Sequence, residues 1–142
     1  MVNLPHITNK KYYNNHSIKL KNIVRNNTLH YGDWGIVSCK EGIITPNQLE
    51  TARCLLSKVI KHIGKLWIKI LPDHIITHRP KDSRMGSGKG KPYKWVFVIR
   101  PGDIIFEATK ISKHLVLKTF KLVKDKLPLD VKIIYKNDIY SN

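Results

Sequence analysis

The clearest hydrophobic pattern in the chain is a helical period that begins after Thr45. Apolar residues recur three or four positions apart, which is the spacing of one helix face. They are Leu49, Ala52, Leu56, Val59, Ile60 and Ile63. Thr45-Pro46-Asn47-Gln48 has the sequence of a capping box, in which the Thr45 hydroxyl and the Gln48 side chain each accept a backbone N–H of the other. Pro46 suits the first helical position, so the pattern predicts a helix from there to the stop at Gly64.

A second helical period follows Ser112, which is placed to act as an N-cap. Its predicted inner face consists of Leu115, Val116, Thr119, Phe120 and Val123. Lysines occupy most of the other positions, which is typical of a solvated helix face. Pro128 cannot continue a helix, so the segment ends before it.

The segments outside the two helices carry apolar, β-branched and aromatic runs that predict strands. These runs are 29–39, 66–71, 75–77, 93–100, 104–109 and 131–135. Pro101-Gly102-Asp103 separates two of them and is typical of a turn, so we expect a β-hairpin over 93–109. Strands in clusters with two helices predict the α+β class. We expect one α/β sandwich-like domain, with a mixed or antiparallel sheet and both helices packed on one side.

The length of 142 residues fits a single domain of the usual ~100–200 residues. An apolar content of 42% is sufficient for a buried core. We divide the chain into a basic N-terminal arm at 1–28, an α+β domain at 29–136 and a short C-terminal tail at 137–142. Within the domain, residues 79–94 form a Gly-rich segment that we call the basic finger.

The charge of the chain indicates a polyanionic partner. Lys and Arg number 26 against 10 Asp and Glu, which gives a net charge of +16 and a pI near 10.0. Nucleic acid is the common reason for such an excess. A membrane surface is the competing partner, but no run of about 18 apolar residues is present to span a bilayer. We therefore expect nucleic acid and no membrane.

The basic arm contains no Asp or Glu and no sustained hydrophobic period. Such a segment lacks a core of its own and is expected to be ordered by a polyanion. A mitochondrial presequence is the alternative, since those are also poor in acids. Against it, only Arg25 and two Ser or Thr residues precede Asn27. Its candidate RNA-binding residues are Lys10, Lys11, Lys19, Lys21 and Arg25.

The basic finger combines glycines with cations directly ahead of a predicted strand. Glycine removes side-chain bulk and admits positive φ, so this backbone can approach another surface closely. The cations suit phosphates, although a solvated loop is the alternative. The candidate RNA-binding residues are Arg79, Lys81, Arg84, Met85, Gly86, Ser87, Gly88, Lys89, Gly90, Lys91 and Lys94.

Catalytic and metal-binding motifs are weak in this sequence. A P-loop would need Gly where Ser83 stands and a hydroxyl where Gly90 stands, and it would open a helix instead of a strand. Asp73, Asp82 and Asp103 are the acids that a metal-dependent nuclease would need to bring together. Cys39 and Cys54 are fifteen apart with no CxxC pair, so we expect reduced, buried or inert thiols. We predict no enzyme, metal, cofactor or small-molecule substrate.

Several motifs resemble the large-subunit ribosomal protein L-sixteen family of bacterial and organellar type. They are Gly64-Lys65-Leu66-Trp67-Ile68-Lys69-Ile70-Leu71-Pro72-Asp73, Arg84-Met85-Gly86-x-Gly88-Lys89-Gly90, Trp95-Val96, Pro101-Gly102, Phe106-Glu107 and Lys126-Leu127-Pro128. The resemblance covers about Tyr31 to Tyr135. Ser87 stands where many members carry lysine, and Cys54 stands where a second arginine is common.

This resemblance implies a structural constituent of the large ribosomal subunit. It implies binding to large-subunit rRNA near the aminoacyl-tRNA site, contacts with neighbouring ribosomal proteins, and support of tRNA positioning by the finger and arm. Tyr31, Trp34 or Trp67 is placed to stack on a base, with burial in the core favoured for Trp67. A metal-dependent nuclease and a non-ribosomal RNA-binding protein are the alternatives.

The composition also bears on where the protein works. Lysines outnumber arginines 21 to 5, and the chain contains 19 Ile. This bias is the signature of an A/T-rich coding sequence, which in bacterial-type ribosomal proteins often comes from an organelle genome. We therefore expect a mitochondrial ribosome, with a plastid or a bacterial cytoplasm as alternatives.

Overall fold

The first helix begins where the capping sequence predicts. The computed structural model describes residues 28–86, 88–109 and 111–136, and α1 spans Pro46–Ile60. Both halves of the capping box are present, because Gln48 N–H donates to the Thr45 hydroxyl and Thr45 N–H donates to the Gln48 side chain. The helix ends earlier than expected, and Ile63 is 48% exposed instead of lying on the inner face. The buried residues of α1 are Leu49, Ala52, Leu56 and Ile60.

The second helix, α2, spans Lys113–Lys124, and Val116, Thr119 and Val123 are its buried residues. Ser112 is the N-cap residue but its side chain makes no capping hydrogen bond. Leu115, expected on the inner face, is 36% exposed. In the described part of the chain, neither helix is long and apolar enough to cross a membrane.

Within the described residues, seven strands form two antiparallel sheets. The larger sheet has the order β3-β6-β1-β7, from Leu66–Ile68, Ile104–Ala108, Trp34–Ser38 and Val131–Tyr135. The smaller sheet has the order β2-β5-β4, from Gly42–Ile44, Lys91–Ile99 and His74–His78. The short strand β2 was not among the strands predicted from the sequence. It pairs with the end of β5, with Gly42 opposite Ile99.

The expected hairpin over 93–109 is wrong. A turn does follow β5, because Asp103 N–H donates to the Arg100 carbonyl at 3.0 Å. However, β5 pairs with β2 and β4, whereas β6 pairs with β1 and β3. Gly102 N–H donates to the Ser38 carbonyl of β1 at 2.8 Å, so the turn docks on a distant strand. The Pro-Gly sequence redirects the chain from one sheet to the other.

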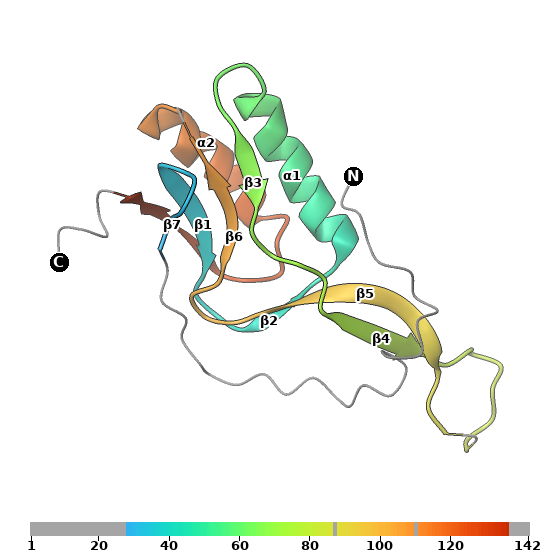
Figure 1. Cartoon of the computed structure of the whole chain (residues 1–142). Coiled ribbons are helices and arrows are strands. Elements are labelled where there is room, and N and C mark those ends of the chain that lie inside the picture. The colour runs from blue at the N-terminus through green and yellow to red at the C-terminus, as the bar shows by residue number, and fades with distance from the viewer. Residues whose placement is uncertain (1–27, 87, 110, 137–142) are drawn as a thin grey trace.

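Both helices cover the same face of the larger sheet (Figure 1). The core lies in this layer and includes Trp34, Ile36 and Phe106 from the sheet and Leu56 and Val116 from the helices. Phe97 and Ile99 of β5 join the same cluster, which ties the smaller sheet to it. The fold is therefore the α+β class that the sequence predicts, with antiparallel pairing throughout the described strands.

Candidate nucleic-acid interface

Strands β4 and β5 form a ribbon that carries the basic finger away from the two layers (Figure 1). Their register places His74 opposite Val96 and His78 opposite Lys91. Near the core the ribbon is anchored by Trp95, which is 1% exposed. The loop between the strands comprises residues 79–90, and residues 91–94 of the finger already belong to β5.

Three glycines give the loop its backbone shape for two different reasons. Gly86 and Gly88 have φ values of +102° and +74°, which residues with a Cβ rarely adopt. Neither would place a Cβ within 4 Å of another atom. Gly90 instead lies against β4, where an added Cβ would be 2.6 Å from the His78 carbonyl oxygen. The outer glycines therefore set the curvature of the loop, and Gly90 closes its base.

Arg79 holds the loop together from within. Its Nη2 donates to the Arg84 carbonyl at 2.8 Å and also to the Gly86 carbonyl. Within the same loop, the Ser83 hydroxyl donates to the Pro80 carbonyl at 2.8 Å. Arg79 was predicted as an RNA-binding residue, and its Nη2 makes hydrogen bonds to the loop itself.

The structure brings most of the predicted finger residues together on this loop. Met85 is 97% exposed, and the side chains of Lys81, Arg84, Lys89 and Lys91 are exposed around it. Asp82 is the one acid among the described residues of 79–94. Five predicted residues of the basic arm, together with Ser87, lie outside the described residues: Lys10, Lys11, Lys19, Lys21 and Arg25.

An aromatic pair that was not predicted from the sequence lies at the base of the loop. The rings of His78 and Tyr93 are 5.4 Å apart, and Lys94 Nζ lies 5.5 Å from the centre of the Tyr93 ring. Tyr93 is 58% exposed. The signal available in the sequence was the alternation of Tyr93 and Trp95 on one strand, of which only Trp95 is buried.

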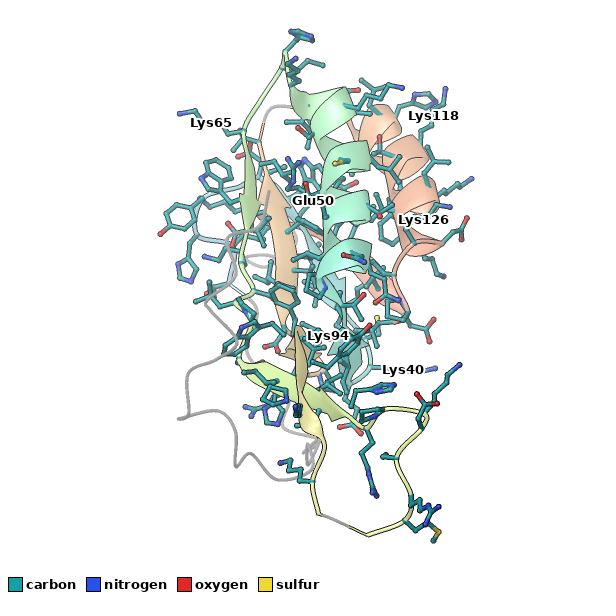
Figure 2. All side chains as sticks on the ribbon, turned by 90° about the vertical axis from the view of Figure 1, so that its right-hand side faces the viewer. Lys40, Glu50, Lys65, Lys94, Lys118 and Lys126 are labelled. Carbon is teal, nitrogen blue, oxygen red and sulfur yellow. The ribbon has the colours of Figure 1, made fainter. Side chains whose placement is uncertain are left out.

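Cations also line the outer side of the helices. Figure 2 shows Lys118 and Lys126 on the outer side of α2, away from the sheet. Arg53 of α1 differs from them because its Nε and Nη2 donate to the Glu50 carboxylate at 2.9 and 2.8 Å. These hydrogen bonds lower the pKa of Glu50 below 4.5 and raise the pKa of Arg53. Arg53 is thus paired within the helix.

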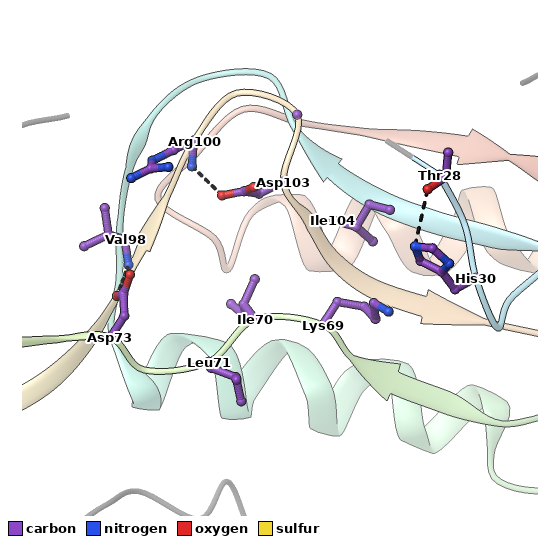
Figure 3. A pocket seen from close by; sticks show the side chains of 11 residues that line it. Thr28, His30, Lys69, Ile70, Leu71, Asp73, Val98, Arg100, Asp103 and Ile104 are labelled. Atoms are coloured by element: carbon purple, nitrogen blue, oxygen red, sulfur yellow. Dashed lines mark hydrogen bonds between the residues drawn. The ribbon is translucent and has the colours of Figure 1, made fainter. Parts of the chain in front are cut away.

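A cavity of about 410 Å³ opens between the two sheets (Figure 3). Arg100 and Asp73 lie at one end of it, and Thr28 and His30 lie at the other. Asp73 accepts Val98 N–H at 3.2 Å, and Asp103 accepts Arg100 N–H at 2.9 Å. Asp82 does not line this cavity. The three acids that a nuclease would need are therefore not gathered there.

Metal-ligating side chains are likewise scattered: within 28–86, 88–109 and 111–136, no three His, Cys, Asp or Glu residues are grouped to hold an ion. Both cysteines are exposed free thiols, so of the expected buried or inert thiols the structure contradicts only the burial. Two of the tryptophans also differ from expectation. Trp34 belongs to the core at 3% exposure, whereas Trp67 is half-buried and stacks on Tyr31.

Together these features define a basic α+β domain that presents a cationic, Gly-rich loop on a two-stranded ribbon. Residues 7–134 match the family model for ribosomal protein L16p/L10e, which is most of the chain. The chain belongs to this family, as the motif resemblance indicated. The family is a non-enzymatic class of structural constituents of the large ribosomal subunit. As a member of this family, the chain is a ribosomal protein that takes part in translation. It binds rRNA and other ribosomal proteins.

Proposed function

We propose that the basic finger binds large-subunit rRNA close to the aminoacyl-tRNA site and supports the positioning of tRNA there. The observation that carries this proposal is the geometry of loop 79–90. The β4–β5 ribbon carries the loop outward, and glycine conformations keep it narrow. Exposed Lys and Arg surround it. Such cations neutralise phosphates and fix the register of a protein on RNA without reading sequence.

The basic arm is proposed to bind the same rRNA. Its five Lys and Arg residues and its lack of any acid support this assignment. We further propose that the ribosome is mitochondrial and the protein organelle-encoded, on the basis of the Lys-over-Arg bias. Sedimentation of the endogenous protein with mitochondrial large subunits, detected by antibody, tests this location. Its recovery only with plastid or bacterial subunits would refute it.

The rRNA contact is tested by the salt dependence of binding. Replacing Lys81, Arg84, Lys89 and Lys91 by Gln removes four exposed cations from the finger. The matched control removes four exposed cations of the second helix and its C-terminal end: Lys118, Lys121, Lys124 and Lys126. Each lost phosphate contact should reduce the log–log salt slope by about 0.7–0.9. We expect the finger variant to lose more slope than the control on purified large-subunit rRNA. Equal losses would contradict the proposal.

The tRNA contact is tested by cross-linking. Met85 is 97% exposed at the loop and is replaced by Cys in a chain whose Cys39 and Cys54 are Ser. The control carries Cys in place of Leu117, which is 51% exposed on α2. With a thiol-reactive photo-cross-linker on assembled ribosomes, the Met85 position should capture aminoacyl-site tRNA and the Leu117 position should not. If the Met85 position captured only rRNA, the finger would contact rRNA but not tRNA.

A further inference from the structure

The face of the larger sheet that lies opposite the helices carries its own set of side chains. Leu66 and Ile68 of β3 pack against the core on the helix side. Successive residues of a strand point to opposite faces, so Trp67 and Lys69 project on the other side. Glu107 of β6 is directly opposite Trp67 in the antiparallel pair and shares this face. An aromatic ring, an ammonium group and a carboxylate therefore meet there.

Glu107 is fully buried on this face and fixes the chain that crosses it. Its Oε2 accepts Tyr31 N–H at 2.8 Å and Gly32 N–H at 3.1 Å. Asp33 N–H, next along the chain, donates to the Ala108 carbonyl at 3.0 Å. Lys69 Nζ lies 3.6 Å from the other carboxylate oxygen and balances its charge. These bonds hold the backbone at Tyr31 in one place above the sheet.

The Tyr31 side chain is ordered but open to solvent. Its ring stacks on Trp67 with centroids 5.8 Å apart and 29° between the planes. Lys69 Nζ lies 4.5 Å from the centre of the same ring. Even so, Tyr31 is 62% exposed. An aromatic surface that is already held in position loses little conformational freedom when a ligand stacks on it.

We propose that Tyr31 and Trp67 form a stacking site for an unpaired base of RNA, with Lys69 beside it for the adjoining phosphate. Bases offer flat π surfaces that stack on aromatic side chains irrespective of sequence. A nucleotide is the occupant that the site suits, because Glu107 is fully buried beneath the rings and its charge is balanced by Lys69, so it does not repel a phosphate. This inference rests on the proposed binding of rRNA and names a second contact, separate from the basic finger.

The cavity between the sheets continues this site. Lys69 and His30 line the cavity, and Arg100 lines its far end (Figure 3). Lys69 therefore belongs to both the stacking site and the cavity wall. The nucleotide next to the stacked base would have its phosphate near Lys69, because the far end of the cavity carries Asp73 and Asp103 beside Arg100. An apolar segment of a neighbouring ribosomal protein is the competing occupant, and the experiment below separates the two.

The test uses two single-stranded RNA 12-mers that differ only in their bases. One contains four central adenines, and the other contains abasic residues at those positions, so their phosphates are the same. The full chain is compared with Tyr31→Ala, Tyr31→Phe and Leu122→Ala, the last being 54% exposed on α2. Tyr31→Ala keeps the two backbone bonds to Glu107, and thermal melting checks that it remains folded.

We expect the unmodified chain to bind the base-containing 12-mer more tightly than the abasic one. Tyr31→Ala should lose roughly 5- to 100-fold of the affinity for the former and leave the affinity for the latter unchanged. Tyr31→Phe and Leu122→Ala should behave as the unmodified chain. With 2-aminopurine at a central position, its fluorescence should be quenched on binding and recover in Tyr31→Ala.

Equal affinity for the two 12-mers would overturn the stacking site while leaving the finger as an rRNA ligand. Tyr31→Ala without effect on RNA, combined with loss of a ribosomal protein from assembled subunits, would assign the surface to a protein neighbour instead. Failure of the unmodified chain to bind either 12-mer or large-subunit rRNA would overturn both this inference and the proposed function.

Discussion

The guanidinium of Arg79 donates a 2.8 Å hydrogen bond to the carbonyl of Arg84 across the loop of the basic finger. The two arginines of this loop therefore have different surroundings. Arg79 bonds to backbone carbonyls, whereas the Arg84 side chain is exposed on the outside of the loop. A planar guanidinium can serve either role, since it presents several donors in a fixed arrangement. Substitution of each arginine should have a distinct result.

Arg79→Ala should loosen the loop without unfolding the domain. The lost hydrogen bonds are solvent-exposed, so the free energy of unfolding should change by less than about 1 kcal/mol. Amide hydrogen exchange over residues 80–90 should become faster, and trypsin should cleave after Arg84 more rapidly. Arg84→Ala, assayed by exchange alone, should leave the loop as protected as before and weaken rRNA binding. Equal exchange rates in both variants would contradict this division.

Gly90→Ala should destabilise the β4–β5 ribbon more than Gly88→Ala. A Cβ at Gly90 would lie 2.6 Å from the His78 carbonyl oxygen, so the backbone must move. A Cβ at Gly88 meets open space, and only its φ of +74° is unfavourable. We expect about 1–3 kcal/mol for Gly90 and about 1 kcal/mol for Gly88. Chemical denaturation measures both, and the reverse order would refute the close contact.

Glu107 should make stability depend on pH in the acid range. Burial would raise the pKa of this carboxyl, but hydrogen bonds from Tyr31 and Gly32 and the charge of Lys69 outweigh it and hold the pKa below 4.5. A lowered folded-state pKa stabilises the protein fully above the unfolded-state value. That contribution should be lost as pH falls from about 4.5 through the lower folded-state pKa.

Glu107→Gln is the variant that checks this assignment. Loss of a charged acceptor for two backbone N–H groups should cost about 1–3 kcal/mol at pH 7. The acid-dependent loss of stability should become shallower in the same variant. Glu50→Gln is the control, because its pair with Arg53 is partly exposed and should contribute less than about 1 kcal/mol. An unchanged pH profile in Glu107→Gln would contradict the assignment.

Leu56→Asp should abolish folding, whereas Lys124→Ala should change stability by less than about 0.5 kcal/mol. Leu56 is 0% exposed in the core layer. Lys124 is the exposed last residue of α2. Circular dichroism and thermal melting of the two variants measure the difference. Comparable destabilisation would show that the helix faces are wrongly assigned.

Elements with local signals were predictable from the sequence. The capping box at Thr45 and the apolar spacing that follows it identify α1, because both depend on residues a few positions apart. The order of the strands was not predictable in this way. Pro101-Gly102 would form a turn whether or not the strands on its two sides pair with each other. A hairpin is excluded by the pairing of β6 with β1, which lies about seventy residues earlier in the chain.

The candidate sites also differ in whether they depend on neighbouring residues or on residues far apart in the sequence. The glycines and cations of the finger are contiguous in sequence, so their grouping was visible before the fold. The position of Tyr31 depends on a hydrogen bond from its backbone N–H to Glu107, 76 residues away. The sequence around Tyr31 does not indicate this bond. The sequence likewise does not indicate the hydrogen bond from Arg79, a predicted RNA-binding residue, to the Arg84 carbonyl within the loop.

Strand β5 has a consequence for how the basic finger responds to a partner. It spans nine residues from Lys91, at the end of the loop, to Ile99, which is fully buried in the core, with one shift in its register with β4 between Ile76 and Thr77. Nine residues of strand extend about 30 Å. The proposed RNA contact at the loop would therefore act on a backbone that continues directly into the layer beneath the helices. This one strand joins the proposed contact to the packing of the core.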